Sequence, residues 1–280
     1  MRKFYLQDEN GLRLDLNNTK EYFFSDPTGL GMKKTIAFSA DGSGFAGVAE
    51  RTVDPINIVG NICITKNHYS RYRSLVSFLM RAQTLTFIYI PSGSDEYCVD
   101  VECEYITKTE IAAGVLTCPV SFRGKTLWYR MTPTIINIVQ PFDIENPFVY
   151  DAEYSMTYTL DGVTDATITA EGHVPAAIDL YVRGKLVNPV IKLQTIDGEL
   201  LGRCKIAETV AARSTLRLCT KYNGEAGIWI DGISKTDSID LTDNVFFRLP
   251  IGTRCLLSVT DDSQTDTNVT VYVYEYFLTV

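Results

Sequence analysis

The sequence predicts an all-β protein with two domains. Strand-forming residues dominate, since 16 Tyr and 13 Phe stand among many Val, Ile and Thr in short alternating runs. A length of 280 residues favours two domains, because one domain usually takes about 100–200 residues. With 45% hydrophobic and 21% charged residues and no long apolar run, the composition argues against disordered, collagen-like and membrane-inserted chains.

Alternation of apolar and polar residues between Gly, Asp, Asn and Pro marks the expected strands. In chain order they are Thr35–Ala40, Asn57–Lys66, Leu85–Ile90, Tyr97–Lys108, Gly114–Phe122, Ser155–Leu160, Asp179–Val182, Val190–Thr195, Thr215–Thr220, Ala226–Asp231, Arg254–Thr260 and Asn268–Val280.

One segment breaks this pattern and predicts a helix over residues 70–83. Its apolar residues recur at helical spacing: Tyr72, Leu75, Val76, Leu79 and Met80. Ser70 can cap the first turn. The first domain is therefore expected to be a β-sandwich that carries one amphipathic helix.

The predicted domain boundary is the segment Gln140–Pro147, because Pro141 and Pro147 remove backbone donors and interrupt any strand. We expect domains at 1–143 and 144–280. The formal charge is −1 for residues 1–145 and −7 for residues 146–280. A total of −8 makes a sequence-specific nucleic-acid surface unexpected. After Arg2 and Lys3 no apolar segment follows, so no signal peptide is expected.

No group of residues predicts catalysis, a cofactor or a metal. Residues 42–47, Gly-Ser-Gly-Phe-Ala-Gly, match G-x-G-x-x-G, but Pro55 prevents the long helix that a dinucleotide site needs. Cys98 and Cys103, with His68, come near zinc spacing, yet residues five apart in a strand point to opposite faces. The stripe Asp100–Glu104 indicates a solvated or subunit-facing surface rather than a glycosidase pair.

Trp229 is the one candidate ligand platform. It alternates with Ile228 and Ile230, so one strand face carries Trp and the other carries Ile. Core packing and an exposed ring that stacks on a sugar both remain open.

Several segments together resemble the distal tail proteins of long-tailed, non-contractile bacteriophages. In the first half these are Phe4–Leu6, Phe23–Gly31, Gly60–Ile62, Leu116–Phe122 and Leu127–Tyr129. In the second half they are Glu171–Ala176, Asn188–Ile191, Phe246–Gly252 and Val271–Phe277. The resemblance covers nearly the whole chain.

The resemblance implies a virion protein of the tail tip or baseplate, without enzyme activity, assembled in the cytoplasm of a bacterial host. In that family the first domain forms a hexameric ring between the tail tube protein and the tail-associated baseplate protein. The second is a galectin-like or carbohydrate-module-like jelly roll that holds receptor-binding proteins or, in some relatives, touches cell-wall sugar. A galectin-type sugar site needs a His, Asn, Arg, Trp and Glu set that the surroundings of Trp229 do not supply, so docking is expected.

The segment Phe23–Met32 is the expected subunit contact. Its candidate contact residues are Phe23, Phe24, Pro27, Leu30 and Met32. Adjacent aromatics, Pro and Gly give too little regular pattern for a core strand, so the segment could reach the next subunit; an ordinary surface loop is the alternative.

Two other functions fit the same pattern. One is a carbohydrate-binding sandwich that acts alone, with Trp229 as its platform. The other is the hub of a contractile injection particle or a phage-derived bacteriocin.

Overall fold

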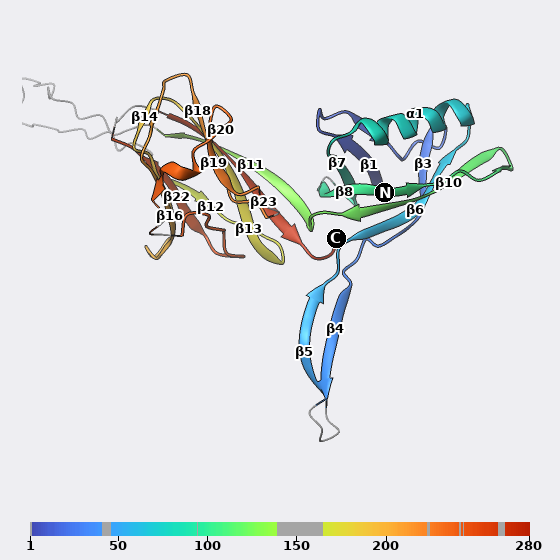
Figure 1. Ribbon diagram of the computed structural model, residues 1–280, viewed down its shortest axis with the longest axis horizontal. Helices are drawn as coiled ribbons and strands as arrows, with labels where there is room; N and C mark the ends of the chain where they lie inside the picture. Colours follow the sequence, from blue (N-terminus) through green and yellow to red (C-terminus); the bar gives the residue numbers. More distant parts are fainter. Residues whose placement is uncertain are drawn as a thin grey trace, which may run out of the picture. The chain divides into compact units, whose positions relative to one another are not determined.

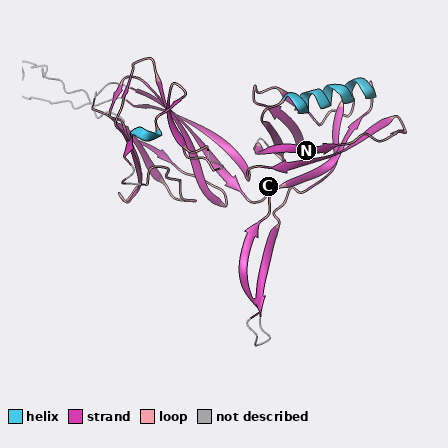
Figure 2. Cartoon of the chain, in the orientation of Figure 1, coloured by secondary structure: helices cyan, strands magenta, loops and turns pink. Residues whose placement is uncertain are grey.

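The computed structural model describes residues 2–40, 46–93, 95–138, 165–222, 225–240, 242, 244–262 and 267–280. It confirms the all-β class, since strands make up nearly all regular structure in these ranges, with one α-helix and one 3₁₀ turn (Figure 1 and Figure 2). The described residues form two compact units, Met1–Arg130 with Tyr276–Val280, and Met131–Glu275. The predicted boundary Gln140–Pro147 and the predicted strand Ser155–Leu160 lie outside the described residues. Neither described helix has the length and apolarity needed to cross a membrane.

Unit 1 is built on one strongly curled antiparallel sheet and a separate hairpin. Its elements are β1 (Lys3–Asp8), β2 (Arg13–Asp15), β3 (Tyr22–Thr28), β4 (Lys34–Ala40), β5 (Ala46–Val53), β6 (Asn57–Ile64), α1 (His68–Arg81), β7 (Leu85–Ile90), β8 (Tyr97–Ile106), β9 (Ile111–Ala112) and β10 (Val115–Gly124).

β8 joins the two halves of this sheet, with β7 on one edge along its first half and β10 on the other edge along its second half. Its residues up to Val101 pair with β7, and those from Val101 onward pair with β10. β10 then pairs with β6, and β6 with β3. Leu16 connects the two ends of this order, since its N–H donates to Phe4 O at 3.1 Å and its carbonyl accepts from Phe24 N at 2.9 Å.

The curled sheet encloses an aromatic core. Phe87 lies at its centre, with ring centroids 5.9 Å from Phe4, 5.7 Å from Phe24 and 5.8 Å from Phe122. Trp128 belongs to the same core, since its side chain is fully buried and packs edge-on against Phe87. Burial of these large rings contributes substantially to the stability of unit 1, together with the aliphatic residues of the same core.

Helix α1 covers this core, as predicted, but the residues on its buried face differ in part from those expected. Leu75 is fully buried, and Phe78 and Leu79 are partly buried against the core. Met80 is 79% exposed, because position i+5 lies about 140° around the helix from Leu75 while i+3 and i+4 stay on its face. The helix begins after Asn67, which has a left-handed φ of 52°, so the expected cap at Ser70 is wrong.

Unit 2 is a sandwich of two antiparallel sheets. Its strands are β12 (Asp165–Ile168), β13 (Val174–Arg183), β14 (Leu186–Val187), β15 (Val190–Thr195), β16 (Leu200–Ile206), β17 (Thr209–Val210), β18 (Thr215–Cys219), β19 (Gly227–Ile230), β20 (Ile233–Ser234), β21 (Ile239–Asp240) and β22 (Cys255–Thr260), and the 3₁₀ turn is Thr236–Ser238. β11 (Trp128–Ile138) and β23 (Thr267–Phe277) each have residues in both units.

The sandwich core comes from alternate residues of facing sheets. One sheet has the order β11-β23-β13-β18-β19-β20, and the other has β12-β22-β15-β16-β21. Residues of β13 and β23 that point inward, such as Leu180 and Val271, are fully buried with Ile191 and Leu193 of the other sheet. The period of two leaves the intervening side chains of β13 and β23 on the outer face.

Candidate functional site

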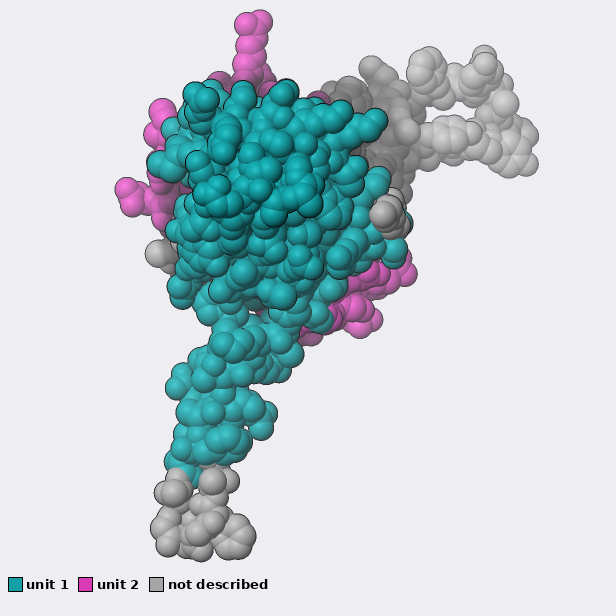
Figure 3. Space-filling model, turned by 90° about the vertical axis from the view of Figure 1, so that its right-hand side faces the viewer, with its two compact units in different colours: residues 1–130, 276–280 teal, residues 131–275 magenta. Residues whose placement is uncertain are grey.

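The β4–β5 hairpin stands outside the core of unit 1. Among the described strands, β4 and β5 pair only with each other. Every side chain described in residues 33–39 and 48–53 is exposed. Figure 1 and Figure 3 show the pair extending from the rest of unit 1 as a narrow ribbon. A lone two-stranded ribbon is marginally stable in water, so we expect another surface to cover it.

The register gives this hairpin one apolar face. That face consists of three cross-strand pairs: Lys34 with Val53, Ile36 with Arg51, and Phe38 with Val48. A bulge next to Ala37 keeps the third pair on the same side as the other two. Phe38 is 65% exposed, and Ile36 and Val48 are each 44% exposed. We call these six residues the ribbon face; it combines apolar side chains with two cations.

A carboxylate ties the two strands together at the root of the hairpin. Asp54 accepts a hydrogen bond from Thr35 Oγ1 at 2.7 Å and lies 3.2 Å from Lys33 Nζ. Its N–H donates to Lys33 O at 2.9 Å. The hydrogen bonds from Thr35 and Lys33 lower the pKa of the Asp54 carboxyl below its ordinary 3.8.

Asp54→Asn is expected to speed amide hydrogen exchange in β4 and β5 at pH 7. Because the folded-state pKa is depressed, the stabilisation is complete above the ordinary pKa of 3.8 and is lost as pH falls through the lower folded-state value. The difference between wild type and variant should therefore vanish in strong acid. Exchange mass spectrometry with labelling times scaled for pH measures it. Glu50→Gln, the same charge change on the same hairpin, serves as control, and an equal effect there would contradict this role of Asp54.

The segment Phe23–Met32 is more regular than expected. Phe23, Phe24 and Pro27 lie in strand β3, which pairs with β6, and the expectation that the segment lacks a core strand is wrong. Phe24 is 2% exposed because its ring packs edge-on against Phe4, and Leu30 packs against the same core. Phe23, at 38%, and Met32, at 42%, are exposed. A subunit contact through these two residues stays a prediction.

The carboxylate stripe of β8 is tied into the sheet. Asp100 accepts hydrogen bonds from Thr86 at 3.0 Å and from Tyr129 at 2.9 Å. Glu102 pairs with Lys125 at 2.7 Å, and Glu104 with Arg123 at 3.2 Å. Each carboxylate thus has its own partners on neighbouring strands, which is the arrangement of a structural surface.

The Cys98, Cys103 and His68 motif does not form a reactive site in the described part of the chain. Burial raises the pKa of the Cys98 thiol to about 12 and that of Cys103 to about 11, so both thiols are protonated at neutral pH. His68 Nε2 lies 2.9 Å from the carbonyl oxygen of Gly114. Within the described part of the chain, no cluster of His, Cys, Asp and Glu could hold a metal ion. Most of the Gly-rich motif, residues 42–45, lies outside the described residues.

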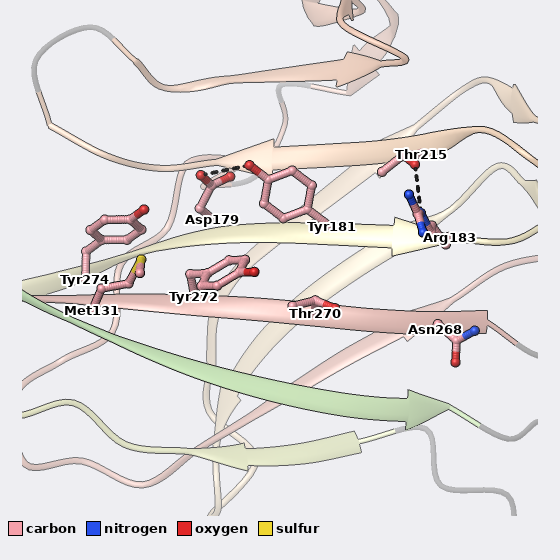
Figure 4. A pocket seen from close by; sticks show the side chains of 9 residues that line it. All are labelled: Met131, Asp179, Tyr181, Arg183, Thr215, Asn268, Thr270, Tyr272 and Tyr274. Atoms are coloured by element: carbon pink, nitrogen blue, oxygen red, sulfur yellow. Dashed lines mark hydrogen bonds between the residues drawn. The ribbon is translucent and has the colours of Figure 1, made fainter. Parts of the chain in front are cut away.

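The outer face of the first sheet of unit 2 carries a second feature, which sequence reasoning missed. Asp179 and Tyr181 of β13 and Tyr272 and Tyr274 of β23 line a hollow of about 610 Å³ (Figure 4). The remaining lining residues are Met131, Arg183, Thr215, Asn268 and Thr270. In the sequence, residues two apart in β13 and in β23 are expected to lie on the same face of each strand. Only the pairing of β13 with β23 shows that the side chains of the two strands meet.

Trp229 lies on this sheet but does not line the hollow. Trp229 of β19 is opposite Arg217 of β18, whose guanidinium carbon lies 5.1 Å from the indole centroid. Its ring also packs over Gly227, where an added Cβ would lie 2.6 Å from an indole carbon. The side chain is half-buried, so neither of the two expectations for Trp229 describes it fully.

The comparisons with known proteins agree with this architecture. Residues 3–125 match the family model described as the distal tail protein, N-terminal domain. None of the curated proteins gives a significant match. Among solved structures, a chain of the phage P2 baseplate in its activated conformation with Ca is 14% identical over 100% of both chains, with a TM-score of 0.66.

A second solved structure is similar over nearly the whole chain. The SPP1 Dit (gp 19.1) protein, described as a paradigm of the hub adsorption apparatus in phages that infect Gram-positive bacteria, is 10% identical. The match covers 97% of this chain and 98% of that one, with a TM-score of 0.62. At these identities the comparison shows a common fold over nearly the full length.

Proposed function

Residues 3–125 belong to the distal tail protein N-terminal domain family, and from this we propose that the protein is a structural hub of a phage tail tip. Copies of the chain form a ring of six through unit 1. The ring joins the tail tube protein to the tail-associated baseplate protein, and unit 2 holds receptor-binding proteins. The work is mechanical, and no side chain carries out a reaction.

The ribbon face is the single observation that carries the proposal. A ring closes when the same head-to-tail contact repeats around an axis, which requires one element that reaches out and one surface that receives it. The β4–β5 hairpin is such an element, since its exposed apolar face has no part in its own core. Contiguous exposed apolar groups of this kind mark interaction sites. The next copy of the chain is the occupant that we propose for this face.

Charge is compatible with a closed ring. Residues 1–145 carry a formal charge of only −1, so six copies of the first domain can meet without strong repulsion. Residues 146–280 carry −7, which favours solubility of the assembled particle. The virion tail tip is the proposed location, with assembly in the host cytoplasm. A contractile particle would use the same architecture, and the neighbouring genes distinguish the two.

Light scattering after size-exclusion chromatography, together with negative-stain microscopy, tests the ring. We expect the full-length chain to reach the mass of six subunits as its concentration rises, and to show a six-fold annulus. A mixture with the tail tube protein and the tail-associated baseplate protein should shift the equilibrium further toward the ring. A chain that stays monomeric throughout, even in that mixture, would contradict the proposal.

A further inference from the structure

The side of helix α1 that points away from the core forms a continuous surface. Leu75 and its neighbours bury the opposite side. Tyr69, Arg73, Val76 and Met80 are spaced at i, i+4, i+7 and i+11, which places them within about 60° of one another around the helix axis. We call these four residues the α1 outer face. It extends over about 17 Å, since an α-helix rises about 1.5 Å per residue.

The α1 outer face exposes large apolar groups. Met80 is 79% exposed and Tyr69 is 53% exposed, and Val76 is half-buried. The solvent side of an amphipathic helix normally carries charged or polar residues instead. Tyr, Met and Arg are enriched at contacts between proteins relative to the rest of the surface. The composition of this face therefore indicates a contact surface.

Helix α1 is also strongly cationic. It contains three Arg and no Asp or Glu, whereas residues 1–145 as a whole have a formal charge of −1. Arg71 is neutralised, because its guanidinium lies 3.0 Å from the Glu21 carboxylate. Within the described part of the chain, neither Arg73 nor Arg81 forms an ion pair with a carboxylate. These two exposed cations are available to the carboxylates of a partner.

Neighbouring elements leave the surroundings of the α1 outer face positive. The ammonium of Lys108 lies 5.1 Å from the ring centroid of Tyr69, so it adds a cation at one end of the face. At the other end, Glu9 accepts a hydrogen bond from the backbone N–H of Gln83 at 3.0 Å, just beyond the helix. That carboxylate thus binds the backbone at the end of α1.

Charge argues against the ribbon face of another copy as the occupant. The ribbon face, which we propose above to contact the next copy, itself contains Lys34 and Arg51. Its contact with the α1 outer face would bring cations together, which is unfavourable. Figure 1 shows α1 and the β4–β5 hairpin on opposite sides of unit 1, so both surfaces can be covered at the same time by different partners.

From these features we propose that the α1 outer face docks an acidic surface of a different tail protein. Carboxylates of that partner pair with Arg73 and Arg81, and its apolar residues cover Tyr69 and Met80. Opposite charges of this kind speed association and fix the orientation of the two proteins. This docking site rests on the proposed function, because it assigns one of the two proposed neighbours of the ring to this side of unit 1.

Binding of the full-length chain to the tail tube protein and, separately, to the tail-associated baseplate protein tests the proposal by calorimetry. One of the two should bind, with a Kd that rises with salt. Arg73→Glu should raise that Kd about tenfold or more, and Met80→Gln severalfold. Both replacements are good helix formers at exposed positions, so the melting temperature should stay near that of wild type. The control, Arg2→Glu, makes the same charge change at an exposed position outside α1 and should leave the Kd nearly unchanged.

Light scattering separates this docking from ring formation. Both α1 variants should reach the same mass as wild type, and loss of the ring in Arg73→Glu would mean that the α1 outer face joins copies, which overturns the proposal. So would an unchanged Kd in both variants, or a wild-type chain that binds neither protein. A chain that binds one of them through Arg73 yet never forms a ring would contradict the hub and leave this docking site standing.

Discussion

A triple variant of the ribbon face, Ile36→Thr, Phe38→Thr and Val48→Thr, is expected to be folded and monomeric. All three side chains are exposed in the single chain, at 44%, 65% and 44%, so their replacement removes nothing from the core. Thr retains strand propensity, so the hairpin itself should persist. Burial of a large apolar side chain contributes about 1.5–3 kcal/mol. Because only the exposed part of each side chain remains to be covered, their loss at every subunit contact should raise the dissociation constant on the order of a hundredfold.

Light scattering and negative-stain microscopy, at the concentrations where wild type forms rings, measure this effect. A matched control replaces apolar residues that are equally exposed elsewhere in unit 1, Leu12→Thr and Met80→Thr, which are 60% and 79% exposed. That control should still form rings. If the triple variant assembled as well as the control, the hairpin would not be the contact, and Phe23 and Met32 would become the next candidates.

Strand β6 could be predicted because its buried residues alternate with exposed or partly exposed ones along the whole strand, and the sequence alternates with them. Strand β3 was not predicted because Asp26 and Pro27 are residues typical of the end of a strand. In the structure the pairing of β3 with β6 shifts register at these two residues, and Asp26 has a φ of 52°. A bulge at this register shift lets β3 continue to pair with β6, although the alternation of apolar and polar residues in its sequence is interrupted.

The candidate surfaces were harder to predict, for a related reason. In the ribbon face, the alternation of apolar and polar residues in β4 indicates that Ile36 and Phe38 share one side of the strand. The sequence of β5 contains Ala, Gly, Glu and Arg and shows no such alternation. Only the bulge next to Ala37 brings Val48 to the same side. In the hollow of unit 2, Tyr181 and Tyr272 are far apart in the chain and meet through strand pairing. Local patterns carry no information on such non-local register.

Gly29→Ala is expected to destabilise unit 1 by about 3 kcal/mol, because two costs add at this position. Gly29 has a φ of +82°, a conformation that costs an L-residue with a side chain about 1 kcal/mol or more. A Cβ there would also lie 1.7 Å from the backbone oxygen of Asn57, the first residue of β6. Backbone cannot rotate away as a side chain can, so either β6 or the start of the hairpin must move.

Gly31→Ala, two residues further along, provides a matched control for the same exchange. Its added Cβ meets nothing within 4 Å, and its φ is not among the positive values, so stability should change by less than about 1 kcal/mol. Calorimetry should show the unit 1 transition lowered by roughly 6–12 °C in Gly29→Ala alone. Equal melting of the two variants would mean that the chain between β3 and β4 adapts freely. The hairpin would then lack the fixed root that a rigid contact between ring subunits requires.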